Sequence, residues 1–336
     1  MRIASFVRTT ALILALVLSL CMVAGVYLVI QIYGTAPETP SDENSTESTG
    51  GASTRPPLIQ NPGTTETQDP TGSVEPPREL TAHHAFVYDM ASGELLMVKG
   101  NLRDRLFPAS ITKLFSAYVI TQHLDLQQQI TAGDALYLPA PDASVAQIKL
   151  GDVLTVEMLL EGMLIPSGND AACILAVEVG RKLGGSHLSN VKAMAVFVEE
   201  MNRQAQLLGL TGTRFSNADG YHEDLHYTTT EDLIKISKLV LEHPLLSRIV
   251  KEDSKTVTFV NGKREYWMAS NFFVNSATEF YDPTCIGLKT GKTDVAGNCL
   301  LAAFRVNGRV LIIGVFGSPE VKDRFLDAQQ ILKDYL

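Results

Sequence analysis

Cysteine and positive charge are both scarce in this sequence, and each shortage argues against a class of function. The chain of 336 residues has four cysteines, and none has a neighbour at the short spacing of a zinc ligand pair. It has 28 lysines and arginines against 37 aspartates and glutamates, for a net charge of −9. Nucleic acids are bound by clustered lysine and arginine, so an acidic chain is a poor candidate for that partner. The sequence predicts no metal site and no cofactor.

The cysteines also leave the question of a disulfide open. Cys21 lies in an apolar N-terminal segment, and Cys173, Cys285 and Cys299 lie in the rest of the chain. Cys285 and Cys299 flank one of the motifs described below and could pair. We interpret all three as unpaired thiols, because sequence alone cannot test the geometry that a disulfide needs.

Acidic side chains are absent from the beginning of the chain. Residues 1–10 contain Arg2 and Arg8, and residues 11–30 are apolar apart from Ser19. About 20 apolar residues span a bilayer, and a positive flank favours the cytoplasmic side. We predict a transmembrane anchor within residues 1–34, with the remainder of the chain outside the cell. A cleaved signal peptide is the alternative, although its apolar region would be about 7–15 residues long and would end at an A-x-A-like site.

Apolar residues are sparse in the next segment, residues 35–79, which is rich in Pro, Thr, Ser, Gly and Glu. Such a composition cannot bury enough surface to offset the entropy of ordering the chain. We predict a disordered linker here and a single catalytic domain over residues 80–336.

Strand patterns lie at both ends of this domain, and helical periodicity lies between them. The expected strands are residues 84–90, 95–99, 256–260, 264–268, 286–290, 298–306 and 309–316. The expected helices are residues 111–123, 156–165, 171–183, 192–208, 230–241 and 320–336. Asn261-Gly262 and Asn307-Gly308 predict hairpin turns. The pattern predicts an α+β domain whose sheet joins the two ends of the chain.

The first motif with chemical potential is Pro-Ala-Ser-Ile-Thr-Lys, which contains Ser110 and Lys113. Residues three apart lie on one face of a helix. A serine at a helix start becomes a nucleophile when a base lies within hydrogen-bond reach, and a desolvated lysine has the lowered pKa that such a base requires. Taken alone, the motif is better explained by an N-cap serine followed by a surface lysine, because serine is a favoured cap.

The second motif is Pro-Ser-Gly-Asn, with Ser167 and Asn169 between two apolar helical segments. A hydroxyl and an amide two residues apart on a tight loop can face one cavity, where Ser167 would relay a proton and Asn169 would bind a substrate amide. Taken alone, the segment also fits a glycine turn that caps a helix from Asp170.

The third motif is Lys289-Thr290-Gly291, followed by Lys292, at the end of an apolar strand. A strand edge can pair with an extended substrate. The lysine adds positive charge, the threonine hydroxyl can hold a carboxylate, and Gly291 allows a ligand to approach the backbone closely. A polar strand end before a turn is the simpler interpretation of this motif alone.

The three motifs occur together in the order S-x-x-K, S-x-N, K-T-G that is typical of β-lactamases and penicillin-binding proteins. From about Ala82 onward the chain resembles the D-alanyl-D-alanine carboxypeptidases, the low-molecular-mass penicillin-binding proteins. The flanks of the second and third motifs and the segment Phe-Ser-Asn-Ala-Asp-Gly at residues 215–220 share the resemblance. It implies a β-lactamase/transpeptidase-like fold, an antiparallel sheet flanked by helices with a helical subdomain.

The resemblance also implies catalytic roles. Ser110 would attack the carbonyl between two D-alanines, Lys113 would take its proton, and Ser167 would pass a proton to the leaving amine. The backbone N–H groups of Ser110 and Lys292 would form the oxyanion hole.

The implied substrate-binding roles fall on five further positions. Asn169 would hold the substrate backbone, Lys289 would supply positive charge, and Thr290 would bind the terminal carboxylate. Gly291 would belong to the edge that receives the substrate. Arg324 occupies the place where the family has an arginine that helps to hold the carboxylate.

The expected activity is therefore removal of the terminal D-alanine from peptidoglycan stem peptides outside the cell, with covalent inhibition by β-lactams. Endopeptidase or transpeptidase action on cross-links would use the same acyl-enzyme. A β-lactamase would need a carboxylate in an E-x-x-L-N-like loop, and no such segment lies between Asn169 and Lys289. A non-catalytic penicillin-binding receptor is disfavoured because Ser110 and Lys113 are both intact.

Overall fold

The structure is a computed structural model that describes residues 80–336. The predicted anchor and linker, residues 1–34 and 35–79, lie outside the described residues. Within residues 80–336, no helix combines the length and the hydropathy needed to cross a bilayer.

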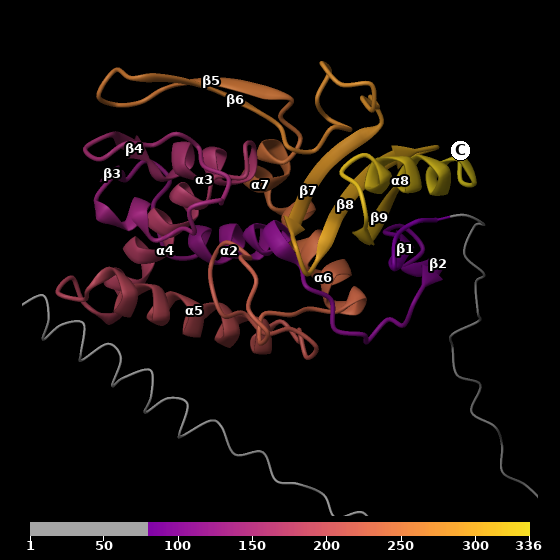
Figure 1. Ribbon diagram of the computed structural model, residues 1–336, viewed down its shortest axis with the longest axis horizontal. Helices are drawn as coiled ribbons and strands as arrows, with labels where there is room; N and C mark the ends of the chain where they lie inside the picture. Colours follow the sequence, from indigo (N-terminus) through magenta and orange to yellow (C-terminus); the bar gives the residue numbers. More distant parts are fainter. Residues whose placement is uncertain (1–79) are drawn as a thin grey trace, which may run out of the picture. The chain divides into compact units, whose positions relative to one another are not determined.

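A five-stranded antiparallel sheet joins the two ends of the described chain. Its strands are β1 (His84–Asp89), β2 (Glu94–Lys99), β7 (Cys285–Thr293), β8 (Gly297–Val306) and β9 (Arg309–Ser318). Their order is β2-β1-β9-β8-β7, so the first strand of the domain pairs with the last. This confirms the predicted α+β class and the predicted closure of the sheet. In Figure 1, β7 forms the edge nearest to the helical part of the domain.

Both predicted hairpin turns are present, but only Asn307-Gly308 has two consecutive residues with positive φ. Asn307 and Gly308 join β8 to β9 with φ values of 49° and 77°. Two consecutive positive φ angles match the twist of an antiparallel pair and are readily adopted by Asn-Gly. Gly262, with φ 87°, lies in the turn between β5 (Ser254–Thr258) and β6 (Arg264–Met268).

Seven α-helices cover the sheet or form the helical part of the described domain. They are α2 (Thr112–Thr121), α3 (Val156–Leu164), α4 (Asn169–Gly184), α5 (Asn190–Leu207), α6 (Thr230–Glu242), α7 (Pro244–Ile249) and α8 (Asp323–Lys333). Helices α3, α4 and α5 pack successively on one another, and α2 contacts all three. Figure 1 shows this group beside β7, while α8 lies against β8 and β9.

Some short elements were not predicted from the sequence. They are α7, strands β3 (Gln129–Thr131) and β4 (Val153–Thr155), and the 3₁₀ turns Ala109–Ile111 and Asp134–Tyr137. Each has at most six residues, which is too short to establish a period of 2 or 3.6. The last helix begins at Asp323, three residues later than predicted.

An aromatic cluster fixes α8 on the sheet and thereby fixes the arginine beside it. The ring of Phe325 lies 4.8 Å from Phe272, 5.1 Å from Phe280 and 5.3 Å from Phe273. Full burial of one such side chain contributes about 1.5–3 kcal/mol. Arg324, the preceding residue, is therefore held at the sheet by the packing of its neighbour.

Candidate active site

Ser110 lies in a strained turn immediately before α2. The turn is the 3₁₀ segment Ala109–Ile111, and Ala109 has a φ of 47°. A non-glycine residue in this region costs about 1–3 kcal/mol, and such strain is typical of functional sites. Ser110 was predicted at the helix start, but α2 begins two residues later, with Ile111 as a cap that makes no side-chain hydrogen bond. The interpretation of Ser110 as an N-cap is therefore wrong.

Lys113 is completely buried one helical turn from Ser110. Its Nζ donates hydrogen bonds to Ser110 Oγ at 2.7 Å and to the main-chain oxygen of Asp219 at 2.8 Å. Burial lowers the pKa of Lys113 to about 8, against the opposing effect of the nearby Asp219 and Asp170 carboxylates. The interpretation as a surface lysine is wrong, and a neutral amine is accessible here near neutral pH.

The second motif forms a tight connection between α3 and α4. Ser167 is buried with a φ of 70°. The N–H of Gly168 donates to Gly162 O at 3.0 Å, and a Cβ on Gly168 would lie only 2.7 Å from that oxygen. Glycine is therefore required here by close backbone approach. No hydrogen bond joins Ser167 to Lys113 or Lys289 among residues 80–336.

Asn169 is the first residue of α4 and is held from two sides. Its N–H donates to the main-chain oxygen of Ser144 at 2.8 Å, and its Nδ2 donates to Asp219 Oδ2 at 2.8 Å. The helix begins at Asn169 after Gly168, one residue earlier than the simple glycine-cap interpretation required. The side chain is buried, and its Oδ1 has no partner within the described chain.

The third motif lies inside β7 and not at its end. Lys289 and Thr290 are buried, and among the strands of residues 80–336 β7 pairs only with β8, so its other edge has no strand partner there. A Cβ on Gly291 would meet Pro108 O at 2.8 Å and Ser110 N at 3.0 Å. The absence of a side chain at Gly291 therefore lets this strand run directly against the turn that carries Ser110.

Ser270 connects the two polar side chains of this strand. Lys289 Nζ donates to Ser270 Oγ at 2.9 Å and to the main-chain oxygen of Thr290 at 3.2 Å. The hydroxyls of Thr290 and Ser270 are also 2.9 Å apart. Burial, with the neighbouring cations Lys113 and Arg324, lowers the pKa of Lys289 well below its usual value.

Arg324 lies behind the same strand, at the start of α8. Its Nη1 donates to Gly291 O at 2.9 Å and to Cys299 O at 3.2 Å, and its buried Nε has no partner within residues 80–336. Burial lowers its pKa to about 10, so it remains a cation at neutral pH. Lys113, Lys289 and Arg324 together make this region favourable for an anion. Lys292 follows on β7 with an exposed side chain.

Three side chains of the site were missed in the sequence. They are Ser270, Asp219 and His226. The His226 ring is buried, and its Nε2 forms a 2.8 Å hydrogen bond with Thr112 Oγ1. Burial and the nearby His222 and Lys113 lower the pKa of His226 to about 4, so the ring is neutral. For Asp219 the only signal was its place in the segment of residues 215–220 that shares the family resemblance.

The described cysteines are all unpaired, which confirms their interpretation as thiols. In the β7–β8 ladder Cys285 lies opposite Phe304, whereas Cys299 lies opposite Gly291, so the two thiols are at different ends of the pair. Burial raises the pKa of Cys299 to about 11 and that of Cys285 to about 12. Both are therefore protonated at neutral pH and poor nucleophiles.

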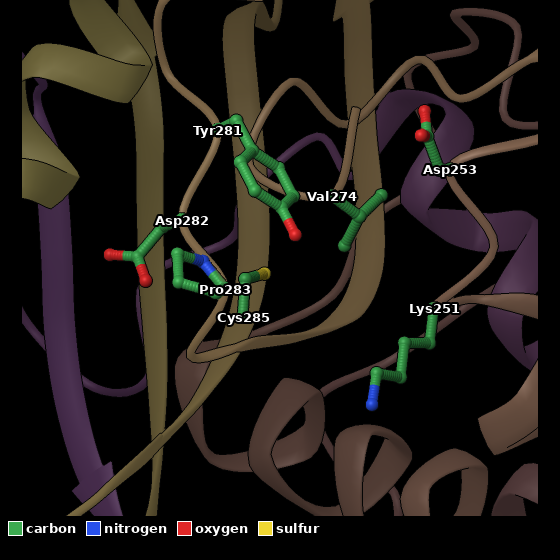
Figure 2. Close-up of a pocket in the computed structure, with 7 residues that line it drawn as sticks. All are labelled: Lys251, Asp253, Val274, Tyr281, Asp282, Pro283 and Cys285. Carbon is green, nitrogen blue, oxygen red and sulfur yellow. The ribbon is translucent and has the colours of Figure 1, made fainter. Parts of the chain in front are cut away.

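A cavity of about 140 Å³ lies at the beginning of β7 (Figure 2). Its lining residues are Lys251, Asp253, Val274, Tyr281, Asp282, Pro283 and Cys285. None of them is a predicted site residue. The cavity is also smaller than the roughly 300–1,000 Å³ typical of small-molecule pockets.

The site as a whole has the parts of a serine acyl-transfer enzyme. A buried lysine hydrogen-bonds the hydroxyl of a serine in a strained turn, and an open strand edge with a buried lysine and threonine runs beside it. A nucleophile with its base in contact and basic side chains nearby is the arrangement that acylation by a carboxylate-bearing substrate requires.

Comparison with known proteins specifies the family. The family described as D-alanyl-D-alanine carboxypeptidase matches residues 70–320. The D-alanyl-D-alanine carboxypeptidase of Streptomyces sp. strain K15 is 30% identical over 262 residues, 75% of this chain and 86% of that protein. DacC of Escherichia coli is 32% identical over 77% of this chain, and DacF of Bacillus subtilis is 30% identical over 75%. The chain belongs to the D-alanyl-D-alanine carboxypeptidase family.

The chain spans only part of some of these relatives, 62% of the E. coli protein and 61% of the B. subtilis protein.

Solved structures agree on the fold. The Streptomyces K15 DD-transpeptidase is 30% identical, with a TM-score of 0.69 over 77% of this chain and 98% of that one. Penicillin-binding protein D2 of Listeria monocytogenes in its cefotaxime-bound form is 29% identical, with a TM-score of 0.63 over the same shares. The β-lactamase/transpeptidase-like fold is thereby confirmed.

Proposed function

We propose that the protein is a serine-type D-Ala-D-Ala carboxypeptidase that removes the terminal D-alanine from peptidoglycan stem peptides. The observation that carries the proposal is the 2.7 Å hydrogen bond from fully buried Lys113 to Ser110 Oγ. A lysine has little reason to be buried beside a serine unless its lowered pKa is used, because burial of a cation is costly.

The proposed reaction has two steps. Lys113, in its neutral form, takes the Ser110 proton as Oγ attacks the penultimate carbonyl, and the backbone N–H groups of Ser110 and Lys292 stabilise the oxyanion. Ser167 gives its hydroxyl proton to the nitrogen of the departing D-alanine as the C–N bond breaks, and it takes back the proton held by Lys113, which becomes neutral again. Water then hydrolyses the ester on Ser110, which releases the shortened peptide and restores the hydroxyl.

Substrate binding is assigned to the cationic side of the site. The free carboxylate of the terminal D-alanine would meet Thr290 Oγ1, with Lys289 and Arg324 supplying positive charge. Charge-assisted hydrogen bonds are roughly twice as strong as neutral ones, which would favour peptides with a free end. The peptide backbone would lie along the open edge of β7 at Gly291, opposite Asn169.

Two related activities share this chemistry. β-Lactams would acylate Ser110 and inhibit the enzyme, in keeping with the cefotaxime-bound form of the Listeria relative. The solved Streptomyces relative is described as a DD-transpeptidase, so attack by an amino group in place of water is the second candidate for the deacylation step.

We also propose that residues 11–30 anchor the protein in the cell membrane with the catalytic domain outside. The support is the length of this apolar run and its arginine-bearing flank. Membrane fractionation with N-terminal sequencing tests this proposal. A soluble protein that begins near residue 37 would contradict it and indicate a cleaved signal peptide.

The activity is tested by measuring D-alanine release from a stem pentapeptide together with labelling by a fluorescent penicillin. Ser110→Ala should abolish both, with little loss of stability because Ser110 caps no helix. Ser237→Ala is a matched control, because Ser237 is a buried serine in α6 whose hydroxyl bonds, within residues 80–336, only to Leu233 O of its own helix. Penicillin labelling without D-alanine release in the unaltered protein would favour the transpeptidase or a binding role, and rapid turnover of penicillin would favour a β-lactamase.

A further inference from the structure

The β5–β6 hairpin is attached to the helical part of the domain along its length. Figure 1 shows it running above α3 and β4. Near its turn, the N–H of Val260 donates to Val153 O at 2.8 Å. Just beyond the end of β6, the N–H of Ser270 donates to Ile165 O at 3.0 Å. Ile165 lies two residues before Ser167, so the base of the hairpin is joined to the connection that carries the second motif.

A tryptophan side chain makes a third contact between these two ends of the hairpin. The indole of Trp267 lies on the buried face of β6, and its Nε1 donates to Ala146 O at 2.9 Å. The N–H of Ala146 donates in turn to Asp170 Oδ1 at 2.8 Å. Trp267 and Asp170 thus hold the two backbone polar groups of one buried residue, and loss of either partner would leave a buried group unsatisfied.

Ala146 packs directly against the turn that carries Ser167. A Cβ on Gly168 would lie 2.7 Å from the Cβ of Ala146, and a Cβ on Gly162 would lie 3.2 Å from it. Ser167 has a φ of 70°, which a residue other than glycine keeps only where the surrounding structure holds it. The position of Ser167 therefore depends on Ala146, and Ala146 is held in place by the indole N–H of Trp267.

We propose, on the basis of the carboxypeptidase function above, that Trp267 is a positioning residue that holds Ser167 where it can protonate the departing amine. The contacts run from the indole N–H through Ala146 to the turn at Ser167. Ser270, at the base of the same hairpin, also accepts from Lys289, so the hairpin connects the second motif with the third. Trp267 acts through Ser167 and not by contact with the substrate.

The choice of leaving group separates this role from a general loss of stability. An amine leaves only once its nitrogen has gained a proton, whereas an alkoxide leaves an ester with less help from an acid. A displaced Ser167 should therefore slow a peptide that ends in D-Ala-D-Ala more than the matched ester that ends in D-Ala-D-lactate. The measured quantity is kcat/KM for each substrate, and Ser167→Ala sets the size of the selective loss. If Ser167→Ala shows no selective loss, the proposal fails.

Trp267→Phe keeps an aromatic ring and removes the N–H. We expect its kcat/KM to fall roughly 5–50-fold for the amide and less than about threefold for the ester. Val257→Ala is the matched control, because it weakens the buried face of the same hairpin and leaves the indole hydrogen bond in place. Its ratio of amide to ester activity should equal that of the unaltered enzyme. Equal losses on both substrates in Trp267→Phe, or the same change of ratio in Val257→Ala, would overturn the proposal.

A single-atom exchange keeps the test decisive if Trp267→Phe folds poorly. Trp267 is the only tryptophan in the sequence, so replacement of tryptophan by benzothienylalanine during expression changes this residue alone. The replacement puts sulfur in the place of the N–H and preserves the shape of the double ring. The substituted protein should show the same selective loss on the amide, and full amide activity in it would overturn the proposal.

Acylation by penicillin distinguishes a failure of this proposal from a failure of the proposed function. Opening of the β-lactam ring also needs a proton on the departing nitrogen, so the acylation rate should fall in the order unaltered protein, Trp267→Phe, Ser167→Ala. An unaltered protein that acylates but never releases D-alanine would refute the carboxypeptidase function, while this order would still test Trp267. A Trp267→Phe protein that acylates as fast as the unaltered one, beside a slow Ser167→Ala, would overturn the role of Trp267.

Discussion

The pH dependence of acylation tests whether Lys113 is the general base. Burial lowers the pKa of Lys113 to about 8, and only its neutral form can take the Ser110 proton. The neutral fraction is then roughly 1% at pH 6, roughly 9% at pH 7 and about half at pH 8. We expect the second-order rate constant for acylation by a penicillin to rise about tenfold per unit below about pH 7 and to level off above about pH 8.

Lys289 should impose the opposite dependence, because its proposed role requires a cation. Its pKa is held well below the usual value by burial and by the charges of Lys113 and Arg324. As the pH rises through that pKa the positive charge is lost, so acylation should fall on the alkaline side. Lys289→Arg keeps a cation at every accessible pH. This substitution should remove the fall in acylation rate at high pH, and it should shift the rise in rate at low pH by no more than about one pH unit.

The assay is stopped-flow acylation with a chromogenic cephalosporin across the range from about pH 6 to about pH 10. Lys113→Arg is the control, since a permanently protonated side chain cannot serve as a base. A rate that is flat across this range in the unaltered enzyme, or an active Lys113→Arg variant, would refute the assignment of Lys113.

Three further predictions concern the carboxylate pocket and the domain boundary. Ser270→Ala removes the hydroxyl that joins Lys289 to Thr290, and we expect about a tenfold lower kcat/KM for D-alanine release, mainly through KM, with Ser237→Ala unchanged. Arg324→Ala should lower kcat/KM by roughly 10–150-fold for a peptide with a free carboxylate and much less for its C-terminal amide; equal losses on both peptides would remove Arg324 from carboxylate binding. Residues 80–336 expressed alone should fold and retain acylation, and an inactive fragment beside an active full chain would place the domain boundary elsewhere.

Local sequence pattern was sufficient for the parts of the site that lie close together along the chain. Ser110 and Lys113 are three residues apart, and the structure joins them directly. The predicted hairpin at Asn307-Gly308 fixes the register of β8 on β9, and the strand patterns at both ends predicted the pairing of β1 with β9 that the structure contains. In each case the local preference of the sequence agrees with the fold that the structure has.

Contacts between distant segments could not be predicted in this way. Asp219 meets Asn169 across 50 positions and Lys113 across 106, and Ser270 meets Lys289 across 19. None of these pairs belongs to one helix face or one strand ladder, so no periodicity relates them. The positive φ of Ala109 was equally unpredictable, because the turn packs against Gly220 and Gly291, which are distant in sequence.

The most direct test of the central claim is mass spectrometry of the protein after reaction with a penicillin. The account predicts a single adduct of one penicilloyl group, located by peptide mapping on Ser110, and absent from Ser110→Ala while Ser237→Ala still carries it. The same Ser110→Ala preparation should release no D-alanine from the pentapeptide. An adduct on another residue, or D-alanine release that persists without Ser110, would contradict the acyl-enzyme on which every proposed role in this site depends.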